Sequence, residues 1–342
     1  MVSLHLIESS NNQIKSTLPP GLVAVFVGAT NGIGETTVKQ FAKHATKPRV
    51  YIIGRSQEAG DRIVAECKEL NPEGTFIFLQ RDTSLIRNVD EVCHELVSKE
   101  KAINILFLTI GTLQSGFKTE EGLHYPTALT VHARSRFISN LLPLLQRAES
   151  LRRVVSVYMA THEAQINMDD FQGWNLSRYA NMGHTASLIT LDLEAHHKAA
   201  PEVSFVHNFP GAVESGIARG SIGAFMRVLK TIYAFLGPLV HIPLVEAGDR
   251  HLFLCTSARF SSGVEDVAAG VPLGDGLAVA RGTDGQAGCG VYSIDANGES
   301  AGPKAERLLA ELRSQGLVEK VREVIDTDIN WALASSGGTK IA

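Results

Sequence analysis

Short apolar runs alternate along the chain with stretches in which apolar residues recur every three to four positions. The first run, residues 22–27, is continuously apolar, which is typical of a strand buried on both faces of a sheet. A helical stripe of Val38, Phe41 and Ala42 follows it. Further strands are predicted at residues 50–53, 76–79, 103–110, 154–157 and 203–207, and residues 290–294 can form a last one. Strands separated by helices pair in parallel through right-handed crossovers, so the pattern predicts an α/β fold with a doubly wound, Rossmann-type sheet.

The repeating pattern continues without a linker rich in proline, glycine or serine, so one domain is expected from residue 18 to residue 330. Residues 1–17 would then be an N-terminal extension and residues 331–342 a tail. Within the domain, residues 212–245 are apolar and are expected to cap the site. A terminal amphipathic helix is predicted near the C-terminus, with an interruption at Gly316.

Composition and charge exclude several classes of protein. With 342 residues the chain can bury a full core without disulfide or metal staples. Its 32 Lys and Arg nearly balance 36 Asp and Glu, which leaves a net charge of −4 and no basic footprint for nucleic acid. The four cysteines lie far apart, so we expect no metal site and a reduced, cytoplasmic protein. The opening residues lack a secretory signal, and the apolar run 231–245 is shorter than the roughly 20 residues of a membrane span.

A glycine-rich turn joins the first predicted strand to the first predicted helix. It reads Gly28-Ala29-Thr30-Asn31-Gly32-Ile33-Gly34. Gly28 permits a tight turn, Gly32 lets the backbone approach a pyrophosphate, and Gly34 lets the helix pack closely on the strand. Because the strand comes before the turn and the helix after it, we expect these residues to bind a dinucleotide cofactor.

The type of dinucleotide is indicated by the chain about twenty residues further on, where an acid usually binds the adenosine ribose. Here that place is occupied by Gly54-Arg55-Ser56-Gln57. A guanidinium offers planar, charge-assisted hydrogen bonds to a 2′-phosphate, whereas an acid would repel that group. Arg55 therefore favours NADP(H) over NAD(H).

These residues resemble the short-chain dehydrogenase/reductase family, over residues 22 to about 294. The spacing Gly28-x-x-x-Gly32-x-Gly34 is that family's own variant. Asp82, in Arg81-Asp82-Thr83, is similar to its adenine-contacting acid, and Pro210 and Gly211 are similar to the Pro-Gly pair that borders the nicotinamide. Thr109-Ile110-Gly111 stands in place of the family's usual Asn-Ala-Gly. The glycine of that motif is retained, so the resemblance implies that Gly111 contacts the cofactor. The chain is especially similar to reductases of filamentous-fungal secondary metabolism.

The resemblance also implies an Asn-Ser-Tyr-Lys catalytic tetrad, and three of its four positions depart from the pattern. His132 stands in place of the asparagine, Met159 of the serine and Gly183 of the lysine, while Tyr179 keeps the tyrosine. A phenol with a pKa of about 10 is protonated at neutral pH, so Tyr179 is expected to donate the proton in a reduction. His132 is a candidate for a replacement acid or for orienting Tyr179. Tyr158, next to the missing serine, can present its hydroxyl to a substrate oxygen.

Together these features predict an NADPH-dependent reductase of a C=O or C=N group in a small, apolar secondary metabolite. The losses at Met159 and Gly183 keep open a redox-neutral cyclase, isomerase or dehydratase that retains the cofactor pocket as a scaffold. A non-enzymatic protein that binds a nucleotide as a sensor or scaffold is a third hypothesis. The resemblance implies a homodimer or tetramer through the helices that carry His132 and Tyr179. His196 and His197 are expected at a solvated helix end.

Overall fold

A computed structural model describes residues 2–213, 242–263, 269–274 and 276–336 of the chain. Its described residues form a seven-stranded parallel sheet in the order β3-β2-β1-β4-β5-β6-β7. The strands are β1 (Val23–Val27), β2 (Arg49–Gly54), β3 (Thr75–Gln80), β4 (Ile105–Leu108), β5 (Arg153–Val157), β6 (Ser204–Asn208) and β7 (Val291–Ile294). The strand order reverses between β1 and β4, and such a reversal opens a crevice at the carboxyl ends of the strands. The predicted α/β, doubly wound fold is confirmed.

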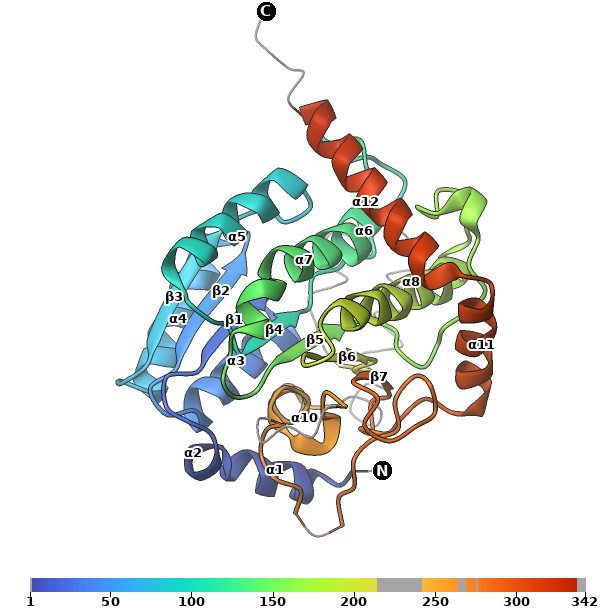
Figure 1. Ribbon diagram of the computed structural model, residues 1–342. Helices are drawn as coiled ribbons and strands as arrows, with labels where there is room; N and C mark the ends of the chain where they lie inside the picture. Colours follow the sequence, from blue (N-terminus) through green and yellow to red (C-terminus); the bar gives the residue numbers. More distant parts are fainter. Residues whose placement is uncertain (1, 214–241, 264–268, 275, 337–342) are drawn as a thin grey trace, which may run out of the picture.

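Helices cover both faces of the sheet (Figure 1). One face carries α5 (Ile86–Lys99), α7 (Ala133–Gln146) and α8 (Arg178–Ala199), and the other carries α3 (Gly32–His44), α4 (Gln57–Leu70) and α10 (Leu244–Thr256). The short elements are α6 (Tyr125–Thr127), the π-helical turn η1 (Ala128–His132) and the 3₁₀ turns η2 (Met168–Asp170) and η4 (Ala258–Phe260). Two layers of helices therefore enclose the strands and leave their carboxyl ends as the open edge.

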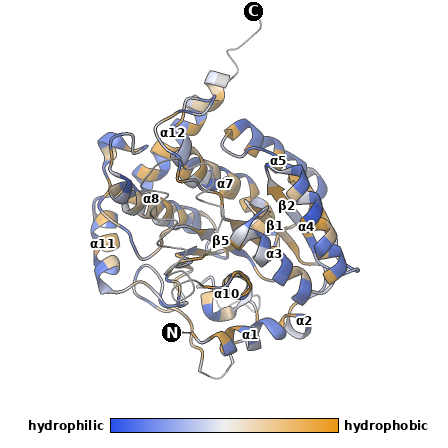
Figure 2. Ribbon diagram, turned by 180° about the vertical axis from the view of Figure 1, so that it is seen from behind, coloured by the Kyte–Doolittle hydropathy of each residue, from blue (hydrophilic) through white to orange (hydrophobic). Residues whose placement is uncertain are grey.

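The apolar pattern of the sequence explains these layers. In β1, Ala24 and Phe26 pack with α3 and α10, whereas Val25 and Val27 pack with α5 and α7. A strand buried on both faces needs a continuous apolar run, and β1 has one. Seen from behind, the outer helices α4, α5 and α11 (Pro303–Ser314) show stretches of hydrophilic residues (Figure 2). Within the described residues, no helix has the length and apolar character needed to cross a membrane.

Both ends of the described chain pack against this domain. Helices α1 (Leu4–Asn12) and α2 (Ile14–Thr17) lie within residues 1–17 and bury Ile7 and Ile14 in the same apolar cluster as β1. At the other end, Gly316, with a φ of +70°, separates α11 from α12 (Leu317–Ser336), as the interrupted pattern predicts. Helix α12 continues past residue 330 and lies across α8 (Figure 1).

The predicted cap, residues 212–245, lies outside the described residues except at its two ends. There the backbone N–H of Ile242 donates to the carbonyl oxygen of Ala212 over 2.9 Å. The segment thus leaves the domain just after β6 and returns beside the same point, directly before α10.

Candidate cofactor and catalytic site

Steric contacts fix the glycine-rich turn between β1 and α3. Gly28 and Gly32 have φ values of +83° and +54°, in the left-handed region that favours glycine. A Cβ at Gly28 would lie 2.9 Å from the backbone nitrogen of Ile110, and a Cβ at Gly34 would lie 2.8 Å from the carbonyl oxygen of Gly28. Thr109 Oγ1 lies 3.1 Å from the carbonyl oxygens of both Val27 and Gly28. The turn is therefore packed directly against the end of β4, with no room for larger side chains.

The amino end of α3 follows the glycine turn directly and has no side-chain cap from Asn31. The helix begins at Gly32, and the side chain of its N-cap residue, Asn31, makes no capping hydrogen bond within the described structure. The first N–H groups of a helix have no partner inside the helix and carry its positive dipole end. This end of α3, framed by the glycine turn, has the donors that a pyrophosphate requires.

A surface hollow of about 340 Å³ opens at the carboxyl ends of β2 and β3. Its lining residues are Arg55, Gln80, Arg81, Asp82 and Asn88. Arg55 donates from Nη1 to the hydroxyl of Tyr125 over 3.1 Å, and Gln80 donates to the carbonyl oxygen of Arg55 over 3.0 Å. Two arginines thus line one hollow, and Arg81 Nε also lies 3.3 Å from Glu91 Oε2. The sequence interpretation named Arg55 but missed Arg81 as a second cation, because it could not show that the two strand ends share one hollow.

Two further contacts shape this part of the site. Asp82 accepts from the backbone N–H of Ser84 over 3.0 Å, which fixes its carboxylate after β3. A Cβ at Gly54 would lie 2.4 Å from Thr30 Cγ2, so a glycine is needed where Thr30 of the turn packs on the end of β2. The sequence interpretation named Gly54 only as the start of Gly54-Arg55-Ser56-Gln57 and gave it no role, because its packing against Thr30 is a contact between distant segments.

The carboxyl ends of β4 and β6 carry the two other glycines expected to border the cofactor. Gly211 has a φ of +75°, and a Cβ there would lie 2.8 Å from Ala296 Cβ. Gly111 is less crowded, because the nearest atom to a Cβ would be Thr130 Cγ2 at 3.7 Å. Pro210 lies between β6 and Gly211. The structure therefore places these residues at the open edge of the sheet, with a strict steric need for glycine at Gly211 alone.

Two of the positions that the family resemblance aligns with the tetrad, Tyr179 and Gly183, lie one turn apart on α8. Tyr179, in the first turn of α8, has 87% of its surface exposed. Four residues further on, a Cβ at Gly183 would lie 2.7 Å from Ala164 Cβ and 3.0 Å from the carbonyl oxygen of His162. A larger side chain at Gly183 would therefore meet no empty space, because the loop after β5 packs against the helix there.

His132 is fully buried at the junction of η1 and α7. Its Nδ1 lies 3.2 Å from the carbonyl oxygen of Thr127, and its Nε2 lies 2.9 Å from Asp328 Oδ2 on α12. Both ring nitrogens thus have partners from the protein. The structure connects His132 to the C-terminal helix and leaves neither nitrogen free for a substrate.

Tyr158 follows β5 and extends the sheet, since its backbone N–H donates to the carbonyl oxygen of Asn208 over 2.8 Å. Its ring lies beside Arg134 of α7, whose guanidinium carbon is 6.0 Å from the ring centroid. Arg134 is buried, and its guanidinium donates to acceptors at the ends of β4 and β5: the carbonyl oxygens of Leu108, Ile110 and Val157 and the hydroxyl of Ser156. A phenol and a buried cation therefore meet at the open edge of the sheet.

The electrostatics of this pair follow from burial. Among the described residues, no carboxylate lies within ion-pair distance of Arg134, and burial lowers its pKa to about 9. Burial raises the pKa of Tyr158, while a hydrogen bond with the Thr185 hydroxyl and the charge of Arg134 act in the opposite direction. The phenol is protonated at neutral pH. The sequence interpretation missed Arg134, although an arginine on the apolar stripe with Phe137, Ile138 and Leu141 was a visible signal.

Comparisons with known proteins agree with this geometry. Residues 22–124 match the sequence pattern of the short chain dehydrogenase family. The oxidoreductase AN1596 of Emericella nidulans is 37% identical over 328 residues, which span 94% of this chain and 96% of that protein. This chain belongs to the short-chain dehydrogenase/reductase family. The oxidoreductase andH of Emericella variicolor is a further relative, 32% identical over 87% of this chain and 88% of its own length.

Solved structures of dehydrogenases and reductases share the fold at low sequence identity. L-sorbose reductase from Gluconobacter frateurii, complexed with NADPH and L-sorbose, superposes with a TM-score of 0.53 at 17% identity, over 70% of this chain and 92% of that one. The alcohol dehydrogenase of the archaeon Thermococcus sibiricus superposes with a TM-score of 0.52 at 16% identity, over 72% of this chain and 93% of that one.

As a short-chain dehydrogenase/reductase, this chain is an oxidoreductase homologous to fungal oxidoreductases. Its glycine turn has the spacing Gly28-x-x-x-Gly32-x-Gly34. At the carboxyl end of β5, a tyrosine and a buried cation lie together as Tyr158 and Arg134, with the guanidinium carbon 6.0 Å from the ring centroid.

Proposed function

We propose that this enzyme is an NADPH-dependent reductase of a C=O or C=N group in a small, apolar secondary metabolite. The observation that carries the proposal is the pairing of Tyr158 with the buried guanidinium of Arg134 at the same sheet edge as the dinucleotide turn. A proton donor beside a cofactor site is what the reduction of a carbonyl or imine requires.

The turn from Gly28 to Gly34 and the amino end of α3 would hold the pyrophosphate of NADP(H). Arg55 and Arg81 would hold the 2′-phosphate in the hollow they line, and Asp82 would contact the adenine. When bound, the cofactor supplies a hydride from C4 of its nicotinamide to the unsaturated carbon of the substrate.

In this proposal Tyr158 gives its hydroxyl proton to the substrate oxygen or nitrogen. The product is an alcohol or amine, and the phenolate left behind takes a proton from solvent. Arg134 stabilises that phenolate, because a fixed positive charge in a poorly hydrated site favours the anion. We assign His132 to holding α12, since both of its nitrogens have protein partners. Tyr179 stays a competing candidate for the donor, because it occupies the family's tyrosine position.

The apolar class of the substrate rests on the resemblance to fungal secondary metabolism and on exposed aromatic side chains. Phe117 and Trp174 lie in the loops that follow β4 and β5, and 44% and 39% of their surfaces are exposed. Trp174 stacks on His124 with the ring centroids 4.1 Å apart. Flat apolar surfaces beside the carboxyl ends of the strands suit a substrate with rings or hydrocarbon groups.

A redox-neutral cyclase, isomerase or dehydratase is the second candidate. It is favoured by Met159, whose thioether cannot donate a hydrogen bond to a substrate oxygen, and by Gly183, where the packing of Ala164 leaves no room for a lysine. Such an enzyme would bind the cofactor without consuming it.

Isotope transfer separates these two functions. Purified enzyme is incubated with metabolite extracts and NADPH that carries deuterium at C4, on each face in separate samples, and products are analysed by mass spectrometry. A product two hydrogens richer that contains deuterium supports the reductase. An isomeric or dehydrated product without deuterium, formed only with active enzyme, would replace it by the redox-neutral function.

A further inference from the structure

The turn that follows β5 places a histidine ring at the open edge of the sheet. The backbone N–H of His162 donates to the carbonyl oxygen of Met159 over 3.2 Å, which closes the turn. The ring of His162 packs in a T-shaped contact on the ring of Phe209, with the centroids 4.6 Å apart. Phe209 follows β6 directly and precedes Pro210, which the family resemblance places beside the nicotinamide. His162 therefore lies at the carboxyl ends of β5 and β6, next to the expected nicotinamide site.

The backbone on both sides of His162 is held by the fold. Thr161 has a φ of +66°, a left-handed conformation that a β-branched residue seldom adopts. Its N–H donates to Ser293 Oγ over 2.8 Å, and that hydroxyl donates to the buried carboxylate of Glu163 over 2.6 Å. Thr190 of α8 donates to the same carboxylate oxygen over 2.9 Å. A strained backbone persists only where its surroundings over-determine it, so these contacts set the position of His162.

The two ring nitrogens of His162 have different surroundings. Nδ1 lies 3.0 Å from the carbonyl oxygen of Ala160 and 3.4 Å from Thr161 Oγ1. A carbonyl oxygen can only accept, so Nδ1 carries a hydrogen and Nε2 of the neutral ring has a free lone pair. Among the described residues no group forms a hydrogen bond with Nε2, and His162 is exposed. The turn therefore presents a hydrogen-bond acceptor at the open edge.

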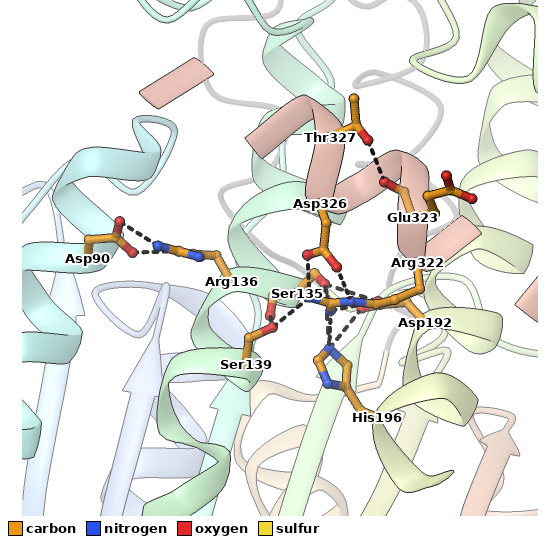
Figure 3. A network of polar contacts seen from close by, with 10 residues as sticks. All are labelled: Asp90, Ser135, Arg136, Ser139, Asp192, His196, Arg322, Glu323, Asp326 and Thr327. Atoms are coloured by element: carbon orange, nitrogen blue, oxygen red, sulfur yellow. Dashed lines mark hydrogen bonds and ion pairs between the residues drawn. The ribbon is translucent and has the colours of Figure 1, made fainter. Parts of the chain in front are cut away.

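Two buried histidines of α8 are held by protein contacts instead. Nε2 of His196 accepts from Arg322 Nη1 of α12 over 2.7 Å (Figure 3). His196 is buried, so the expectation of a solvated helix end is wrong for this residue, because α12 covers it. His184 has partners for both nitrogens, a backbone N–H at 3.2 Å and a carbonyl oxygen at 2.9 Å. These rings stabilise the packing of α8, whereas Nε2 of His162 is available to a ligand.

We infer that His162 binds the substrate by accepting, through Nε2, a hydrogen bond from an O–H or N–H group close to the carbon that takes the hydride. The inference rests on the proposed reductase and narrows its substrate to an apolar molecule with a hydrogen-bond donor beside the reacting C=O or C=N. Tyr158 donates and His162 accepts, so the two groups can bind neighbouring atoms of one substrate. A molecule without the donor would gain no hydrogen bond from His162 and would bind more weakly.

Variants at position 162 test the contact with the extract component that the enzyme converts in the deuterium experiment. His162→Ala should raise KM for that component by roughly three- to tenfold, the value of one hydrogen bond. It should leave kcat nearly unchanged, because the contact is made before and during hydride transfer. His162→Gln keeps an acceptor and should recover most of the loss, whereas His162→Lys can only donate and should not. His94→Ala, at an exposed histidine of α5, is the matched control.

These results separate the inference from the proposed reductase. An unchanged KM in His162→Ala, or recovery in His162→Lys but not in His162→Gln, would overturn the acceptor role of His162 whether or not deuterium is transferred. Absence of deuterium from the product of the native enzyme would overturn the reductase, and the KM values would still report the contact with the substrate.

Chemical labelling tests the position of His162 without turnover. Diethyl pyrocarbonate acylates free imidazole nitrogens, and peptide mass spectrometry follows each histidine separately. His162 should react in the free enzyme and lose most of that reactivity with saturating NADP⁺, whereas 2′,5′-ADP, which lacks the nicotinamide, should leave it reactive. His94 should react equally in all three samples. A His162 that is inert in the free enzyme, or that NADP⁺ does not protect, would contradict the inference.

Discussion

The open edge of the sheet has two halves. The cofactor half lies at β1, β2 and α3, the proposed catalytic half lies at β5 and α8, and the two differ in how closely they follow the family pattern. At β1, β2 and α3, the glycines meet backbone atoms at distances that no side chain tolerates, as at Gly28 and Gly34. At β5 and α8, the pattern depends on functional groups, and the family resemblance predicts that Met159 and Gly183 replace two of them. A backbone that must approach a ligand closely can be built in few ways. A hydroxyl or a positive charge, by contrast, can be supplied from another element, and we propose Tyr158 and Arg134 for that role.

The largest expected effect is on the proposed proton donor. Tyr158→Phe removes the hydroxyl and should lower turnover by roughly 10² to 10⁴, the usual contribution of a general acid. Because burial raises the pKa of Tyr158, the native enzyme should keep its reductase activity through neutral pH and lose it only in strongly alkaline solution. Turnover against pH, measured with NADPH in excess, checks both statements.

The control for this variant is another buried tyrosine. Tyr292 of β7 donates its hydroxyl to the carbonyl oxygen of Ser261 over 2.7 Å, and Tyr292→Phe should affect stability far more than turnover. Tyr179→Phe is the third variant to compare, because Tyr179 occupies the family's tyrosine position. A greater loss of turnover in Tyr179→Phe than in Tyr158→Phe would return the donor role to the family position and remove the distinction between the two halves.

The next effect concerns the cofactor half. Arg55→Ala should weaken NADPH binding by roughly ten- to a hundredfold, since a charge-assisted hydrogen bond contributes about 1.5–3 kcal/mol. NADH lacks the 2′-phosphate, so its affinity should change little. The difference should shrink as salt is added, because Arg55 is exposed. Equal weakening of NADPH and NADH in fluorescence titrations would exclude Arg55 from the 2′-phosphate site.

The sequence predicted those parts of the molecule that depend on local chain properties. The continuous apolar run of β1, the stripe of α3 and the break at Gly316 were all visible, because burial and backbone geometry act on neighbouring residues. The glycine turn was visible for the same reason. Its steric contacts with Ile110 and Thr109 explain why the pattern is so strict.

Contacts between segments that are distant in the sequence could not be predicted from local patterns. The buried cation of Arg134 depends on carbonyl groups at the ends of β4 and β5, which only the folded sheet brings together. His132 was named for its chemistry, but its partner Asp328 lies 196 residues away in sequence. The amphipathic pattern of α12 predicted a helix with one apolar face, yet nothing in it indicated that this face covers α7 and α8.

A smaller effect is expected when the family's lysine is restored. Gly183→Lys places a Cβ within 2.7 Å of Ala164 Cβ, and such overpacking costs about 1–3 kcal/mol of the free energy of unfolding. We therefore expect a lower melting temperature and no gain in turnover, even together with Met159→Ser. Gly274→Lys is the control, because a side chain there meets open space. A rise in turnover would mean that the catalytic half still accepts the family arrangement.

The smallest effect should distinguish the two halves most cleanly. Asp328 on α12 contacts His132 and Gln172, which belong to the catalytic half, and among the described residues it forms no hydrogen bond or ion pair with the glycine turn or with Arg55. Asp328→Asn keeps one acceptor oxygen and weakens these two contacts, at a cost of about 1 kcal/mol. Turnover should fall by less than tenfold while the affinity for NADPH stays constant, and Glu323→Gln on the exposed side of α12 should change neither. A parallel loss of NADPH affinity in Asp328→Asn would show that α12 supports the whole sheet edge, and the two halves could then no longer be treated as independent.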